Sequence, residues 1–350
     1  MGRRETSGDA AEAMTASQTP WVILALAVFV ICAVALGLTV GAFPVTLDGA
    51  ARALGRVWSG AGPQAPDERV LLSIRGPRVV AGLVVGAALA AAGVVYQGLF
   101  RNPLVSPDVL GVTAGAGLGA VLGIFLSLPA LLIQTFAFAG GLATVAIVYF
   151  IAVAVQGRDP TLVLVLGGVV VGALAGAIIS LMKILADPYD QLPAITFWLL
   201  GSLASVRGSD LATVLPVVVA GLVPLVLLRW RINVLSLGDE EAKALGLDAV
   251  RLRTIVIAAA TLITASVVAI TGVIGWVGLV IPHISRMLVG PNFERLLPTA
   301  MLMGAGYLVL VDTLARSLGR IEVPIGILTA MVGAPFFLWL LWRGRHGWSS

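Results

Sequence analysis

Paired arginines beside an uncharged stretch are the first residues of this chain that point to chemistry. Arg75 and Arg78 directly precede Val79–Phe100, and an Arg-Asn-Pro turn begins at Arg101. At about 1.5 Å per residue, a helix over Val79–Phe100 is roughly 33 Å long, enough to cross the hydrocarbon core of a bilayer. Paired positive charge at one aqueous end of such a helix predicts a place where a partner binds. The alternative is that the arginines only anchor the helix end.

Groups that catalyse reactions are scarce. The chain has two lysines, Lys183 and Lys243, and neither belongs to a Gly-x-x-x-x-Gly-Lys-Ser/Thr phosphate loop. His283 and His346 are far apart in sequence, so we expect a solvated or capping role for each rather than a metal site. The single cysteine, Cys32, is expected to be a small buried hydrophobe. We therefore predict no enzyme activity, no bound cofactor and no metal on this chain.

Composition places the chain in a membrane. Of its 350 residues, 59% are hydrophobic and 11% are charged, and the mean hydropathy is +1.03. Soluble domains carry about 25% charged residues, so the expected fold class is an all-α polytopic membrane protein. The 41 glycines agree, because small residues let helices approach closely in lipid. The basic residues are scattered at the ends of the apolar runs, which predicts membrane orientation rather than nucleic-acid binding.

About ten apolar runs are long enough to be transmembrane helices. Residues 1–20 then form an N-terminal tail, residues 21–342 one membrane domain, and residues 343–350 a C-terminal tail. A cleaved signal peptide is the alternative for the first run, although that run exceeds the usual length of a signal sequence. The predicted spans are Trp21–Phe43, Val79–Phe100, Val109–Leu128, Leu131–Val155, Thr161–Leu185, Leu211–Leu228, Thr254–Thr271, Val273–Leu288, Leu296–Ala315 and Pro324–Trp342.

An even number of spans places both termini on one side of the membrane. That side also receives most of the 22 Lys and Arg residues, which predicts that both termini are cytoplasmic. Three segments between spans are long enough to fold: Pro44–Ile74 and Asp187–Asp210 outside, and Arg229–Arg253 inside. Leu47–Trp58 fits an amphipathic surface helix. The internal segment predicts two short helices around Gly238 and Gly246, with Asp239–Glu241 favouring a helix start.

Longer motifs, taken together, resemble a known family, the FecCD-type permeases. These proteins are the membrane subunits of ABC importers for iron–siderophores, haem and cobalamin. The resemblance runs in order from about Arg75 to Leu341. It is carried by Arg75-Gly-Pro-Arg78, Gly86-Ala-Ala-Leu89, Gln97, Arg101-Asn-Pro-Leu104, Pro107, Leu110-Gly111, Leu237-Gly238, Ala242, Leu245-Gly246, Gly272-Val-Ile-Gly-Trp-Val-Gly-Leu-Val-Ile-Pro-His283, Arg286, Leu297-Pro298, Asp312, Arg316, Glu322-Val-Pro324 and Gly333-Ala-Pro335.

The resemblance implies the type II ABC importer permease architecture, with ten helices per subunit in the bacterial cytoplasmic (inner) membrane. It also implies a homodimer that is driven by two separate ATP-binding subunits, which hold ATP and Mg. Cargo, a metal chelate, would come from a periplasmic or lipid-anchored substrate-binding protein. Nucleic acid is not an expected partner.

Three sets of residues receive roles from the resemblance. The binding protein would dock, through its glutamates, on Arg75, Arg78 and Arg316. The ATPase would contact residues 234–250, with Leu237, Gly238, Ala242, Leu245 and Gly246 as the matching positions. The cytoplasmic gate would lie at Asp159, Pro160 and Thr161. Gln97 is expected to join helices rather than to line the pathway.

Two further readings stay open. Within the family, a ferric siderophore or related iron complex is the expected cargo, with haem or cobalamin as the alternatives. An ion-coupled secondary carrier is the alternative from another class, because broken Gly-rich helices can bind ions through carbonyl groups. Such carriers usually hold ionisable groups at mid-membrane. Here Asp312 is the exception among the acids, and we expect it to pair with Arg316 one helical turn later.

Overall fold

The structure is a computed structural model that describes residues 2–41, 43, 45–59, 65–155, 160–319 and 321–344. Within these ranges the chain is helical and contains no strand. The elements are α1 (Gly2–Thr39), α2 (Leu47–Trp58), α3 (Pro66–Val70), the π-helical turn η1 (Leu71–Arg75), α4 (Gly76–Leu99), the 3₁₀ turn η2 (Pro107–Leu110), α5 (Val112–Phe125), α6 (Ala130–Ala154), α7 (Pro160–Leu185), α8 (Gln191–Leu200), α9 (Gly208–Leu227), α10 (Arg229–Leu235), α11 (Asp239–Ala244), α12 (Ala249–Thr271), α13 (Val277–Val289), α14 (Phe293–Ala315) and α15 (Ile325–Gly344).

Each predicted span coincides with a helix. In the described part of the chain, seven helices are long and apolar enough to cross a membrane, among them α4, α12 and α14. The predicted spans over α5, α13 and α15 correspond to shorter apolar helices. The all-α membrane fold is therefore confirmed. The first helix begins at Gly2, well before the predicted span.

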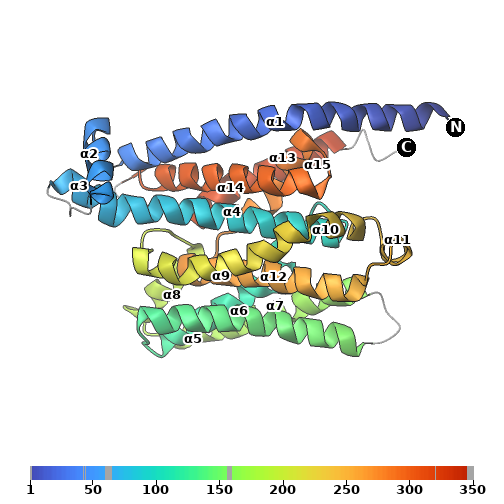
Figure 1. Ribbon diagram of the computed structural model, residues 1–350. Helices are drawn as coiled ribbons and strands as arrows, with labels where there is room; N and C mark the ends of the chain where they lie inside the picture. Colours follow the sequence, from blue (N-terminus) through green and yellow to red (C-terminus); the bar gives the residue numbers. More distant parts are fainter. Residues whose placement is uncertain are drawn as a thin grey trace.

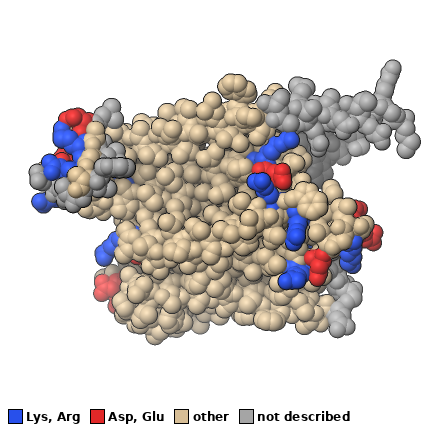
Figure 2. Space-filling model, viewed as in Figure 1, with Lys and Arg blue, Asp and Glu red and all other residues tan. Residues whose placement is uncertain are grey.

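Charged side chains gather at the two ends of the bundle and leave an apolar band between them. Figure 1 shows the long helices lying side by side, with α2 and α3 at one end and α10 and α11 at the other. In Figure 2, Lys, Arg, Asp and Glu are concentrated at these two ends. The start of α1 and the end of α15 both lie at the α11 end (Figure 1). This arrangement is the one that a bilayer requires of a spanning bundle.

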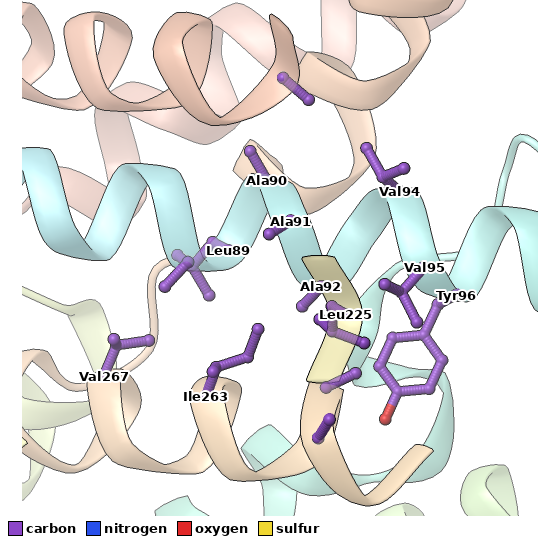
Figure 3. Close-up of a cluster of buried hydrophobic side chains, with 14 of the residues drawn as sticks. Leu89, Ala90, Ala91, Ala92, Val94, Val95, Tyr96, Leu225, Ile263 and Val267 are labelled. Atoms are coloured by element: carbon purple, nitrogen blue, oxygen red, sulfur yellow. The ribbon is translucent and has the colours of Figure 1, made fainter. Parts of the chain in front are cut away.

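Helix α4 forms the centre of the bundle because its small residues admit close neighbours. Its Leu89 and Ala92 point toward Leu225 of α9 and Ile263 and Val267 of α12, whereas Ala90 points to the opposite side (Figure 3), toward Gly304 of α14. A Cβ on Gly86 would lie 2.1 Å from the carbonyl oxygen of Gly304 in α14, and one on Gly93 would lie 2.0 Å from that of Gly278 in α13. Glycine is therefore required at both crossings.

Polar side chains also join α4 to its neighbours. The hydroxyl groups of Tyr96 and Thr261 are 3.0 Å apart, and Nε2 of Gln97 donates to the carbonyl oxygen of Leu279 at 3.1 Å. Gln97 is buried, so the expectation that it joins helices is confirmed.

Two expectations are wrong. The segment Asp187–Asp210 is not wholly aqueous, because it contains the apolar helix α8, whose Ile195 is fully buried. Cys32 is exposed on α1 rather than buried. His283 is half-buried, and its ring centroid lies 6.2 Å from that of Phe336 and 6.5 Å from that of Phe337 in α15. His346 lies outside the described residues.

Candidate functional site

Five charged residues from distant parts of the sequence meet at the α2 end of the bundle. We call Arg75, Arg78, Asp312, Arg316 and Glu322 the charge cluster. Nε of Arg78 donates to Oδ1 of Asp312 at 2.7 Å, and its Nη1 donates to Oε1 of Glu322 at 2.9 Å. The side chains of Arg78 and Asp312 are 7% and 2% exposed, whereas that of Glu322 is 43% exposed. Glu322 is therefore the member of this trio that solvent reaches.

Arg75 caps a helix instead of facing solvent. Its Nη1 donates to the carbonyl oxygens of Leu38 at 2.8 Å and Thr39 at 3.0 Å, in the last turn of α1. The last four carbonyl groups of a helix have no hydrogen-bond partner within it. The guanidinium group of Arg75 supplies that partner, and the carbonyl oxygens in turn accept from its buried N–H groups. Arg75 and Arg78 are 4% and 6% exposed, so both guanidinium groups are buried at this end of the bundle.

Arg316 completes the charge cluster. Its Nε lies 3.5 Å from Oδ2 of Asp312, which confirms the predicted pair one helical turn apart. Its Nη2 donates to the carbonyl oxygen of Gly37 in α1. Burial lowers the pKa of Arg316, and the charge of Asp312 opposes that change. Three arginines face two acids here, so the cluster keeps one uncompensated positive charge.

A cavity of about 1000 Å³ opens beside the charge cluster. Glu322 lines the cavity together with residues from the starts of α6 and α9. Gln134 of α6 donates through Nε2 to Oδ1 of Asp210 in α9 at 3.3 Å, and the backbone N–H of Arg207 donates to Oδ2 of Asp210 at 2.8 Å. Phe197 and Trp198 of α8 supply apolar walls. The cavity therefore combines apolar surfaces with a few fixed polar groups, as ligand-binding cavities do.

The opposite end carries the predicted pair of short helices, α10 and α11. Helix α11 begins at Asp239, as the sequence predicts, and ends at a glycine in the left-handed conformation, Gly246, with φ of 75°. The N–H of Leu247 donates to the carbonyl oxygen of Ala242 and the N–H of Gly246 to that of Lys243, both at 2.9 Å. This bonding is the Schellman arrangement that fixes a helix end.

Apolar side chains are exposed around this helix pair. Leu237, Leu245 and Val250 are 62%, 59% and 64% exposed, although charged residues surround them at this end (Figure 2). Ala242 is fully buried and holds α11 against the bundle. Exposed apolar side chains on an otherwise charged end indicate a surface that a protein partner covers.

The structure describes only part of the predicted gate. Asp159 lies outside the described residues, Pro160 is the first residue of α7, and Thr161 follows it in the first turn. Among the described residues, no group of three or more His, Cys, Asp or Glu is placed to hold a metal ion.

Sequence reasoning missed the role of Glu322. The residue belongs to a quoted motif, but its sequence position gives no sign that it contacts Arg78, which lies 244 residues earlier. A contact of that sequence separation becomes visible only when α4 and α14 are packed together.

Comparisons with known proteins agree on one family. A sequence model of the FecCD transport family matches residues 25–343. The molybdate import system permease protein MolB of Haemophilus influenzae is 45% identical over 80% of this chain and 83% of its own length. A probable iron chelatin transport system permease protein of Helicobacter pylori is 42% identical, over 79% and 83% of the two chains. The cobalamin import system permease protein BtuC of Halobacterium salinarum is 44% identical, over 77% and 72%.

A solved structure shows the same fold. It is described as an inward-facing conformation of a putative metal-chelate type ABC transporter, and it superposes with a TM-score of 0.83 at 39% sequence identity. The match covers 93% of this chain and 99% of that one.

Proposed function

The chain belongs to the FecCD transport family, and we propose that it is the permease subunit of an ATP-driven importer of a ferric chelate. The exposed apolar surface at the α11 end carries this proposal. It offers a separate ATPase a place to bind, while the chain itself has no phosphate loop. ATP and Mg would then be held by that partner. This chain would form the passage through the membrane, and it would transmit the conformational change of the ATPase to that passage.

We propose a homodimer with two ATP-binding subunits. The apolar residues of α7 are exposed along much of its length, among them Leu166, Val170, Leu174 and Leu181. Lipid can cover one side of such a helix, and a second copy of the chain would cover another. In a bacterial cytoplasmic membrane, the α11 end and both termini would face the cytoplasm, and the α2 end would face outward.

We propose that the substrate-binding protein docks at the α2 end, on the region that Arg75, Arg78 and Arg316 mark. In the structure these arginines already have partners, so docking requires an exchange. Glu322 is the exposed partner of Arg78, and a carboxylate of the binding protein can take its place without breaking the buried Arg78–Asp312 pair. Arg75 and Arg316 would remain bound to the end of α1 and support the site.

For the cargo, we propose a chemical class of compound and not one named compound. A ferric siderophore or related iron chelate is the first candidate, and haem or cobalamin are alternatives within the family. The likeness to a molybdate permease adds a metal oxyanion, which the sequence motifs did not suggest. An ion-coupled carrier would need none of the partner proteins.

Association with the ATPase provides a direct test. Replacing Leu245 by Asp puts a charge on the exposed apolar surface, and we expect the affinity for the purified ATPase subunit to fall roughly tenfold or more. Binding is measured with the chain in detergent or nanodiscs. Tyr189→Asp is the matched control, because Tyr189 is 87% exposed outside the α11 end. Equal affinity in both variants would contradict this docking surface, and ATP hydrolysis by the chain alone would contradict the proposed function itself.

A further inference from the structure

Helix α12 and helix α13 are separated by an irregular segment inside the bundle, Gly272–Trp276, which we call the break. Its depth follows from its neighbours. A Cβ on Gly93 of α4 would lie 2.0 Å from the carbonyl oxygen of Gly278, two residues after the end of the break. Gly93 lies roughly 25 Å along α4 from its start at Gly76, at about 1.5 Å per residue. The break therefore lies at membrane depth and not in a surface loop.

The backbone of the break has unpaired donors. In the part of the chain that the structure describes, the N–H groups of Val273, Ile274 and Gly275 donate no hydrogen bond, while Gly272 N–H still donates to Val268. An unpaired backbone group facing hydrocarbon costs several kcal/mol, so irregular backbone at this depth is either buried in protein or lines water.

Exposure along the break alternates. Ile274 is 5% exposed, whereas Val273 and Gly275 on either side of it are half-buried. Alternation with a period of two is the pattern of an extended chain with one face toward the core. A Cβ added to Gly275 would have no atom within 4 Å. One face of the break therefore looks into open space.

Two other interrupted segments adjoin the break. The N–H of Ile325, at the start of α15, donates to the carbonyl oxygen of Gly201 after α8 at 2.9 Å. A Cβ on Gly201 would lie 2.2 Å from the carbonyl oxygen of Val273, so these backbones touch. Ser202 and Thr271, bonded at 2.8 Å through Ser202 N–H and the Thr271 carbonyl oxygen, both line the 1000 Å³ cavity. The cavity thus reaches the residue that precedes the break.

We propose that the break lines the water-filled passage of this subunit and that its unpaired N–H groups donate hydrogen bonds to oxygen atoms of the cargo. Carboxylate, hydroxamate, phenolate and metal-oxyanion oxygens are the acceptors that such donors take. Because the side chains of the break carry no charge, these hydrogen bonds would hold the cargo only weakly. The cargo could therefore leave the break again. The part of the proposal about cargo rests on the proposed import function, whereas the part about water does not.

Cysteine accessibility tests the water-lined wall. The full-length chain, assembled with its ATPase in membranes, carries Cys32→Ser and one of Val273→Cys, Ile274→Cys or Gly275→Cys. Each is treated from both sides of the membrane with a charged, membrane-impermeant methanethiosulfonate. Because the thiolate is the reacting form, only thiols in contact with water react quickly. We expect Val273→Cys and Gly275→Cys to react at least about tenfold faster than Ile274→Cys.

Two controls set the scale. Native Cys32, which is exposed on the apolar surface of α1, should react as slowly as Ile274→Cys, and Tyr189→Cys in an aqueous loop should react fastest. If Val273→Cys and Gly275→Cys react no faster than Cys32 from either side, the break is sealed by protein and the proposal is overturned. Ferric chelate delivered with the binding protein should slow both reactions. If Val273→Cys and Gly275→Cys react fast but the ferric chelate does not slow them, only the proposed contact with the cargo is overturned. If the unsubstituted complex shows no ATP-driven uptake, the proposed function is contradicted instead.

Discussion

Replacing Asp312 by Asn is expected to lower the free energy of unfolding by about 3–5 kcal/mol, because it removes the acid that two buried arginines share. Arg78 donates to Asp312 at 2.7 Å, and Arg316 lies 3.5 Å from it. Asn keeps the shape and one acceptor but not the charge. Arg78 would retain Glu322, whereas Arg316 would lose the acid with which it pairs in the described part of the chain. The thermal midpoint of the detergent-solubilised chain measures the loss.

Asp48→Asn is the matched control for this prediction. Asp48 also forms an ion pair, with Arg52 one helical turn later in α2, but its side chain is 78% exposed. Exposed ion pairs contribute little to stability, so this variant should keep a thermal midpoint close to that of the unmodified chain. Equal loss in the two variants would show that the charge cluster holds α1, α4 and α14 together no more firmly than a surface pair does.

Arg78→Gln is expected to weaken docking of the substrate-binding protein by roughly thirtyfold or more, because truncating one partner of a buried interfacial charge pair costs about 2–5 kcal/mol. Glu322→Gln should have the opposite effect and strengthen docking several-fold, since it vacates Arg78 for the incoming carboxylate. Raising the salt concentration should weaken docking of the unmodified chain through screening. The measured quantity is the affinity of the binding protein for the transporter in nanodiscs.

Arg69→Gln serves as the control for general charge effects. Arg69 is exposed at the same end but lies outside the charge cluster. A loss of affinity as large in Arg69→Gln as in Arg78→Gln would indicate long-range steering alone. If neither Arg78→Gln nor Glu322→Gln changes the affinity or its salt dependence, the three arginines only hold helices together, and docking must use another surface.

The long helices could be predicted from the sequence because they depend on local composition. Apolar runs such as Thr254–Thr271 predict spanning helices wherever charges are absent, and Gly246 marks a helix end by its backbone freedom alone. Helix α8 escaped prediction because its 10 residues lie within a segment bounded by charged residues on both sides. The sequence does separate the spans Thr254–Thr271 and Val273–Leu288 at Gly272, but it does not show how many residues of the second span are irregular, because an apolar run shows no difference between helical and extended backbone.

A different reason explains why the sequence does not predict that the arginines are buried. Asp312 lies 234 residues from Arg78, and the α1 carbonyl groups that bind Arg75 lie 36 and 37 residues before it. Only the packing of α1, α4 and α14 brings these acceptors to the guanidinium groups. The sequence motifs thus located the charge cluster but gave no account of its internal bonding.

Uptake of a radiolabelled ferric chelate into proteoliposomes tests the central proposal most directly. The vesicles contain the chain with or without its ATPase, and the binding protein, ATP and Mg are added or omitted in turn, with molybdate, haem and cobalamin as parallel cargoes. We expect accumulation of one cargo only when the chain, the ATPase, the binding protein and ATP are all present, and we expect it to persist when proton and sodium gradients are abolished. Accumulation by the chain alone, driven by an ion gradient, would contradict the importer and establish a secondary carrier.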